Sequence, residues 1–149
     1  MNDLLSKGAR AIELEAEMRK MTDVHIDLPV IHHFSYGVYM RELFIPAGTL
    51  IVGKVHKHEH VFMLLTGEIS LVNEDGSVSR ITAPFVCVSP PGTKRIAYHH
   101  ADTVGMNIHA NPSNTRDVDV IESETVCESL EDYDKFIELA KQQQLEGGQ

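Results

Sequence analysis

The sequence predicts a mainly β protein, a small barrel or sandwich of short strands flanked by a helix at each end. The chain has 149 residues, the length of one ordinary domain. Between residues 49 and 109 it consists of short β-like segments, each of which closes on Gly, Pro, Asn or Asp. Helical spacing of apolar residues occurs near the two ends instead. Strands so short and so regularly interrupted favour a sandwich or barrel over a βαβ sheet.

The two ends are expected to be helical. Residues 3–21 carry apolar residues at loosely helical spacing without a proline, and Pro29 ends any helix that begins there. Residues 129–145 have Ser129 as a candidate N-cap and an apolar face that includes Phe136. The predicted organisation is an N-terminal helical extension (residues 1–29), a β-barrel (residues 30–121) and a C-terminal helical tail (residues 122–149).

The expected strands lie in order between these helices. Residues 30–44 are rich in Val, Ile, Tyr and Phe, which favour strands. The sequence Glu74-Asp75-Gly76 is typical of a tight hairpin turn. The other β-like segments comprise residues 49–58, 61–66, 68–73, 77–81, 85–89, 95–100 and 104–109.

Charge and composition argue against two classes of partner. The chain carries 13 basic and 22 acidic residues, a net charge of −9, so it lacks the positive surface that nucleic acids require. No apolar run approaches the roughly 18 residues of a membrane-spanning helix, and the N-terminus has no signal-peptide pattern. Cys87 and Cys127 belong to no CxxC motif and are expected to be free thiols in a reducing compartment. A cytoplasmic protein with no nucleic-acid or membrane partner is therefore expected.

Histidines are concentrated in the predicted barrel. The chain has nine, and residues 55–60 read VHKHEH. On one extended strand, the period of two would place His56, His58 and His60 on the same face. Neutral imidazole is the commonest side-chain ligand for transition metals, so this alternation predicts half of a metal site. The alternative is a solvated strand edge whose charged residues, such as Lys57 and Glu59, prevent aggregation.

Two further histidines follow the turn Pro90-Pro91-Gly92. In residues 95–100, Arg95 and His99 share one face of the predicted strand and His100 points to the other. One of the two neighbouring histidines can therefore face the interior, and we assign that place to His99. On an earlier strand, Tyr39 is a candidate for lining a pocket, although tyrosine on a barrel strand usually serves packing.

The stretch from Gly48 to His109 resembles the cupin superfamily. Its first motif, G-x5-H-x-H-x3/4-E-x6-G, matches Gly48, Gly67 and the second histidine at His56. Its second motif, G-x5-P-x-G-x2-H-x3-N, matches the P-x-G at residues 90–92. The sequence departs from the motifs at five positions, where it has Lys54 for the first histidine, His60 for the glutamate, Pro84 for the opening glycine, Arg95 for the third histidine and His99 for the asparagine.

The resemblance implies a jelly-roll β-barrel with a site inside its mouth, and a homodimer formed by strand exchange. Cupins include dioxygenases, isomerases, epimerases, lyases, decarboxylases and proteins that only bind, so no catalytic residue is assigned. One interpretation is a mononuclear metal-dependent enzyme of the dioxygenase, isomerase or lyase type, acting on a small anionic or carbonyl-containing molecule. Its divalent ion (Fe, Mn, Ni or Zn) would be held by His56, His58, His60 and His99.

The other interpretation is a binding or regulatory protein without a metal. In both, Lys54 and Arg95 meet an anionic ligand, and Tyr39 is the third candidate for binding it. In the second, these cations form the whole site and hold a carboxylate or phosphate. Histidines accumulated on one strand face favour the metal.

Overall fold

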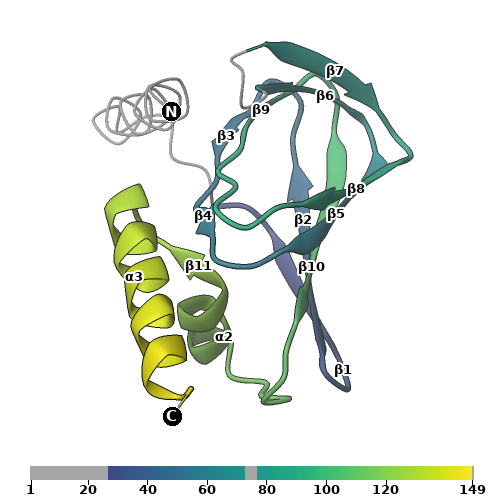
Figure 1. Ribbon diagram of the computed structural model, residues 1–149. Helices are drawn as coiled ribbons and strands as arrows, with labels where there is room; N and C mark the ends of the chain where they lie inside the picture. The colour runs from purple at the N-terminus through teal and green to yellow at the C-terminus, as the bar shows by residue number, and fades with distance from the viewer. Residues whose placement is uncertain (1–26, 73–76, 149) are drawn as a thin grey trace.

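Nine strands form two antiparallel sheets that face each other, and two helices stand at one side of them (Figure 1). The computed structural model describes residues 27–72 and 77–148. The helix expected over residues 3–21 and the hairpin turn expected at residues 74–76 lie outside the described residues. The predicted mainly β fold class is confirmed.

The first sheet has five strands, of which β8 forms an edge. In spatial order they are β1 (Val30–Ser35), β2 (Val38–Ile45), β10 (Thr103–Ala110), β5 (His60–Thr66) and β8 (Phe85–Ser89). The second sheet has four strands, in the order β3 (Leu50–Val52), β9 (Ile96–His99), β6 (Glu68–Val72) and β7 (Val78–Thr82). A short pair, β4 (Val55–His56) and β11 (Val126–Cys127), joins the barrel to the C-terminal segment.

From β5 to β10 the chain crosses repeatedly between the two sheets. Strand β5 lies in the first sheet, β6 and β7 in the second, β8 in the first, β9 in the second and β10 in the first. This crossing pattern builds a jelly roll, in which both sheets turn one face inward. The interior between them is where the polar side chains of the site are placed.

Alternation along each strand sorts its side chains between the interior and the surface. On β5, His60 and Leu64 are buried, with 3% and 1% of their surface exposed, whereas Leu65 is 41% exposed. The same period of two holds on β8, where Val86 and Val88 are exposed and Ser89 is fully buried. The inner face of the five-stranded sheet therefore carries histidines and hydroxyls as well as aliphatic residues.

Gly67 makes the turn between β5 and β6. Its φ of +90° lies in a region that glycine adopts readily, and a Cβ built there would lie 2.6 Å from the carbonyl oxygen of Asp102 and from Oγ1 of Thr103. The close approach of this turn to the start of β10 holds the two sheets together at that end of the barrel.

Two helices follow the last long strand. Helix α2 (Val118–Thr125) begins at Asp117, whose side chain accepts hydrogen bonds from the backbone N–H groups of Asp119 and Val120. Helix α3 (Leu130–Glu146) begins at Ser129, as the sequence predicted for residues 129–145. Helix α2 and strand β11 were not predicted. Ile121 and Thr125 of α2 are 2% and 9% exposed, so one face of this helix is buried.

The segment predicted as one strand over residues 49–58 is broken, and this prediction was wrong. Strand β3 ends at Val52 and β4 begins at Val55, with Gly53 held across from Arg95 by a backbone hydrogen bond of 2.8 Å. The chain then turns over residues 57–59 before β5 begins at His60. Residues 55–60 are therefore not one extended strand.

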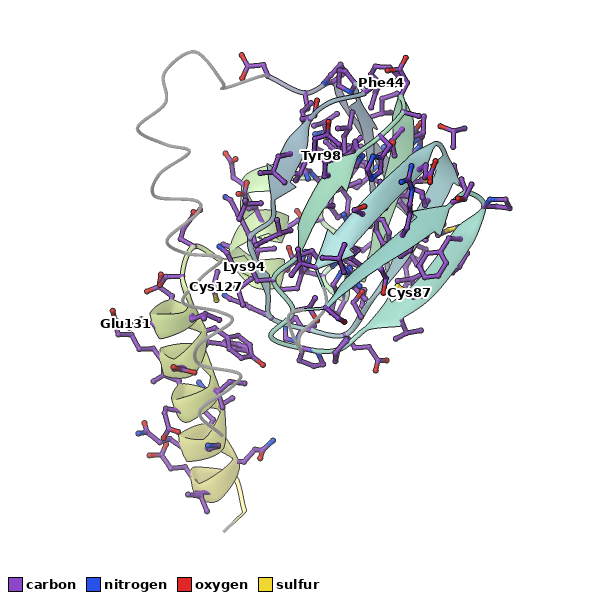
Figure 2. The ribbon with its side chains drawn as sticks, turned by 90° about the horizontal axis from the view of Figure 1, so that it is seen from above. Phe44, Cys87, Lys94, Tyr98, Cys127 and Glu131 are labelled. Carbon is purple, nitrogen blue, oxygen red and sulfur yellow. The ribbon has the colours of Figure 1, made fainter. Side chains whose placement is uncertain are left out.

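The two cysteines lie in different parts of the molecule. Cys87 is on β8 in the barrel and Cys127 is on β11 beside α3 (Figure 2), and both are free thiols. Burial raises the pKa of the Cys127 thiol. In the part of the chain that the structure describes, no helix is long and apolar enough to span a bilayer.

Candidate metal centre

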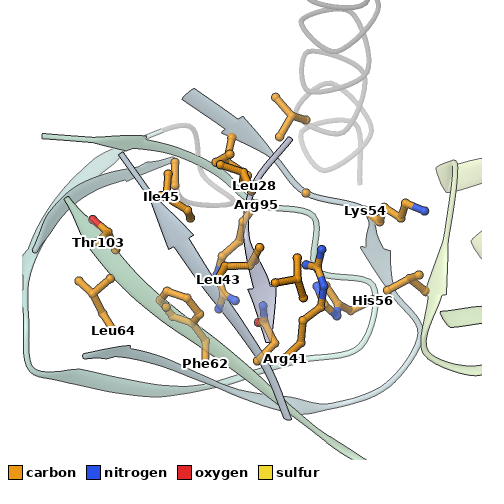
Figure 3. Close-up of a pocket in the computed structure, with 18 of the residues that line it drawn as sticks. Leu28, Arg41, Leu43, Ile45, Lys54, His56, Phe62, Leu64, Arg95 and Thr103 are labelled. Atoms are coloured by element: carbon orange, nitrogen blue, oxygen red, sulfur yellow. The ribbon is translucent and has the colours of Figure 1, made fainter. Parts of the chain in front are cut away.

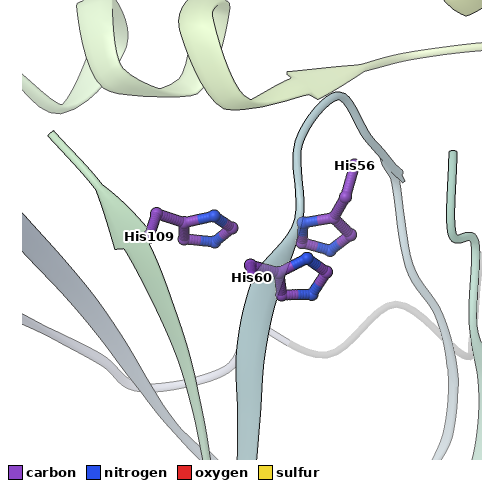
Figure 4. Close-up of side chains that lie close together, drawn as sticks. All are labelled: His56, His60 and His109. Carbon is purple, nitrogen blue, oxygen red and sulfur yellow. The ribbon is translucent and has the colours of Figure 1, made fainter. Parts of the chain in front are cut away.

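Three histidines meet at one end of the barrel interior. They are His56 at the end of β4, His60 at the start of β5 and His109 near the end of β10 (Figure 4). One ring nitrogen of each lies within 4.8 Å of the others. The ring centroids of His56 and His60 are 3.9 Å apart, and those of His60 and His109 are 5.0 Å apart. Imidazoles from three strands thus form a compact cluster.

Strand pairing brings these residues together from distant parts of the sequence. Ile108 of β10 pairs with Val61 of β5, so the next residue of β10, His109, lies beside His60 on the inner face. Two backbone hydrogen bonds hold His56 in place. Its N–H donates to the carbonyl of Thr93, and its carbonyl accepts from the N–H of Gly92. The turn at residues 90–93 therefore fixes the third member of the cluster.

Burial keeps these imidazoles uncharged. His60 and His109 are 3% and 7% exposed. Desolvation, and next the repulsion that His60 and His109 exert when they are protonated, lowers the pKa of His56 from 6.5 to about 2. Desolvation, with His60 next, lowers the pKa of His109 to about 4, and burial lowers the pKa of His60. At neutral pH all three rings are neutral, the form that coordinates metals.

The donor atoms fit one divalent transition metal. Nδ1 of His56 and Nε2 of His60 are buried without a hydrogen-bond partner, although buried polar atoms are nearly always paired. Zinc–nitrogen bonds are about 2.1 Å long and zinc sites are tetrahedral, so two nitrogens on one ion are about 3.4 Å apart. The three ring nitrogens lie within 4.8 Å of one another and reach this spacing by approaching by at most about 1.4 Å.

The structure brings together two of the four residues predicted as metal ligands. His58 lies outside the cluster, on the turn between β4 and β5, and its exposed ring stands edge-on to Phe136 of α3 at 5.6 Å. His99 is buried on β9 and also lies outside the cluster. His109 was not among the predicted residues. On the strand predicted over residues 104–109, the period of two places His109 on the same face as Asn107, and this was the sequence signal that could have identified it.

Tyr39 lies next to the cluster. It is 4% exposed, its ring stacks on His109 at 6.2 Å, and its hydroxyl is hydrogen-bonded to Nδ1 of His32 at 2.7 Å. Burial raises the pKa of the Tyr39 phenol. Tyr39 therefore packs against one candidate ligand and fixes the position of its ring.

A cavity of about 540 Å³ extends from the histidines through the barrel (Figure 3). In the first row of inward side chains, His109 lies across from Tyr39. In the next row Arg41 faces Asn107, which faces Phe62. Leu43, Gly105 and Leu64 form the row beyond. The lining therefore changes from polar to apolar along the strands.

The two predicted cationic residues differ in their surroundings. Lys54 is 41% exposed at the cavity rim, where its Nζ donates to Glu122 and, at 2.7 Å, to Glu128. Arg95 lies further in, donating to Oγ of Ser89, with its guanidinium carbon 5.0 Å from the centre of the Phe62 ring. Two carboxylates compensate the charge of Lys54 at the rim, and Arg95 is part of the cavity lining.

Comparison with known proteins identifies relatives in structure but not in sequence. No protein-family model matches the chain, and no curated protein matches it. A Photorhabdus luminescens protein of known structure, plu4264, is 12% identical over 62% of this chain and 82% of its own, with a TM-score of 0.51. A cupin superfamily protein from Desulfitobacterium hafniense is 12% identical over 56% of this chain and 77% of its own, with a TM-score of 0.49.

An acetylacetone dioxygenase from Acinetobacter johnsonii is also similar, at 15% identity and a TM-score of 0.45. The match covers 56% of this chain and 58% of the dioxygenase, so this chain spans less than two thirds of its length. Identities this low concern the fold and not the activity. The two facing sheets and their crossing order, with the likeness to the Photorhabdus protein, show that the chain has a jelly-roll fold of the kind that its cupin-like motifs predicted.

Proposed function

We propose that the protein binds one divalent transition metal through His56, His60 and His109 and that this centre acts on a small molecule in the barrel cavity. The supporting observation is the cluster itself. Three neutral imidazoles lie close together, two of them buried and that of His56 partly buried, and two of the three have ring nitrogens without a hydrogen-bond partner among the described residues. Leaving such atoms unpaired costs about 1–3 kcal/mol each, which a bound ion offsets.

A centre with three protein ligands keeps coordination positions open, as in catalytic rather than structural metal sites. The bound metal would supply Lewis-acid or redox chemistry, which suits an enzyme of the isomerase, lyase or dioxygenase type. The chain's own residues have other tasks. Tyr39 holds the ring of His109 in place, and Arg95 gives the interior a positive charge for an anionic or carbonyl-containing substrate.

Metal content tests this proposal. The protein is purified without a histidine tag, and its Fe, Mn, Ni and Zn are measured by elemental mass spectrometry before and after reconstitution. We expect near one equivalent of one metal in the wild type and in His58→Ala, which alters an exposed histidine outside the cluster. We expect loss of that metal in His109→Ala. Equal metal content in the two variants would overturn the assignment, and no metal in the wild type would overturn the centre.

A second candidate function is binding of an anion without a metal. It is favoured by the two guanidinium groups near the histidines, because the charges of Arg95 and Arg41 disfavour a further cation there. This candidate predicts no metal in the reconstituted wild type and binding of a carboxylate that is lost in Arg95→Gln. The metal measurement above separates the two functions.

A further inference from the structure

We propose that the cavity takes an amphipathic carboxylate with polar groups at both ends, its carboxylate held by Arg41 and Arg95 and its far end hydrogen-bonded by His99. The inference deepens the proposed function by naming a substrate class for the same cavity. The carboxylate contacts are made by guanidinium groups, so binding can be measured with or without the metal.

The headgroup end is defined by Arg41, a residue that sequence analysis did not assign to the site. Its side chain is exposed and lines the cavity, one row from Tyr39 and His109 and directly across from Asn107. In Figure 3, Arg41 and His56 lie on the same side of the cavity, toward Lys54. The Arg41 guanidinium forms no hydrogen bond or ion pair with any residue of 27–72 or 77–148. A guanidinium group binds a carboxylate through two parallel hydrogen bonds.

The balance of charge favours a monoanion. Arg41 and Arg95 contribute two positive charges to the cavity wall. At the rim, Lys54 is bonded to both Glu122 and Glu128, a group with one negative charge in excess. Asp27 also lines the cavity, so the positive and negative side chains here nearly balance, and a ligand with a single negative charge fits better than a doubly charged phosphate.

The middle of the cavity is apolar. Beyond the row of Arg41, the lining consists of aliphatic side chains from both sheets, with Gly105 between Leu43 and Leu64. Gly105 adds no side chain to this row, and a Cβ built there would lie 3.7 Å from the Phe62 ring. The volume of about 540 Å³ is within the range of small-molecule sites. This middle section favours an alkyl or aromatic body over a compact, fully polar ligand.

The far end has a buried polar atom with no partner. His99 lines the cavity, is 4% exposed, and its Nδ1 makes no hydrogen bond. Its backbone is fixed by hydrogen bonds with Thr49 and Gly48, at the turn that follows Ile45 of β2. Arg41 and Ile45 are four residues apart on β2, roughly 13 Å along the strand. A ligand of that length, ending in a hydroxyl or carbonyl group, satisfies the His99 ring.

Calorimetric titration with three probes tests this inference. The probes are octanoate, ω-hydroxyoctanoate and octanol, each titrated into metal-free and metal-loaded protein. We expect octanoate to bind at least tenfold more tightly than octanol, because octanol lacks the charge. The ω-hydroxy group should improve affinity roughly two- to tenfold through His99.

Variants assign each contribution. Arg41→Gln should weaken octanoate binding roughly ten- to hundredfold, the range of a hydrogen bond to a charged group. Arg80→Gln is the matched control, since Arg80 lies on β7 and is bonded to Glu68 outside the cavity. His99→Phe should abolish the preference for ω-hydroxyoctanoate over octanoate. That preference is a ratio within one protein, so it is independent of any loss of folded fraction.

The outcomes are distinguishable from those of the metal proposal. Equal affinity for octanoate and octanol, or an unchanged affinity in Arg41→Gln, would overturn the carboxylate assignment. A hydroxyl preference that survives in His99→Phe, or that is absent in the wild type, would overturn the role of His99. If the wild type binds the probes as expected but takes up no metal on reconstitution, this inference stands and the metal centre is refuted.

Discussion

The buried histidines should make the metal-free protein unusually sensitive to mild acid. An unfolded histidine has a pKa of about 6.5, whereas in the folded protein burial lowers the pKa of His56 to about 2 and of His109 to about 4. Below about pH 6.5 the unfolded chain therefore takes up protons that the folded protein does not. The free energy of unfolding is therefore not reduced by these histidines above that pH, and it decreases progressively as the pH falls toward their pKa values in the folded protein.

The size of the effect follows from the two pKa values. At about pH 5, protonation favours the unfolded form of each histidine by a factor of roughly 30, or about 2 kcal/mol. For His56 and His109 together, the free energy of unfolding should decrease by about 4 kcal/mol between neutral pH and about pH 5. Because small domains are stable by only about 5–15 kcal/mol, this decrease is readily measured.

Urea unfolding at about pH 7.5 and about pH 5, in the presence of a chelator, measures this decrease in the free energy of unfolding. We expect the pH-dependent loss to shrink by about half in His109→Gln, which cannot be protonated, and to be unchanged in His58→Gln, where the histidine is exposed. Acidic residues titrate equally in all three proteins, so they cancel in the comparison. An equal loss in His109→Gln and the wild type would refute the reasoning.

Three further changes have defined expected outcomes. Gly67→Ala should lower the melting temperature strongly in thermal denaturation, because the new Cβ would clash with the backbone. Gly37 has a φ of +71° but lies in open space, so Gly37→Ala should lower the free energy of unfolding by only about 1 kcal/mol. Equal effects of the two substitutions would contradict this. Lys54→Gln removes exposed ion pairs, so urea unfolding should show a loss below about 1 kcal/mol, and a larger loss would contradict a rim position. We expect a homodimer in which the exposed Val86 and Val88 of β8 meet a second copy, and light scattering should find dimeric wild type and monomeric Val88→Lys; a monomeric wild type would refute it.

Part of the site was predictable because it depends on local sequence. The cupin spacing between Gly48 and Gly67 aligned His56 and His60, and both are in the cluster. The period of two and the Gly and Pro turns predicted most strands, and Ser129 predicted the start of the last helix. These features follow from residues that are neighbours in the chain, so a pattern read along the sequence contains them.

The rest depends on which strands become neighbours in space. His109 joins the cluster because β10 pairs with β5, a register between segments about forty residues apart. The turn after His56 directs His58 to the surface, and β9 places His99 in the barrel interior outside the cluster. Arg41 enters the cavity by pairing across from Asn107. The sequence by itself determined the fold and two of the three clustered histidines. Strand register and the turn over residues 57–59 decided which histidine is the third member of the cluster and which residues line the cavity. Contacts between distant segments leave no periodic signal along the chain, so the sequence pattern does not contain them.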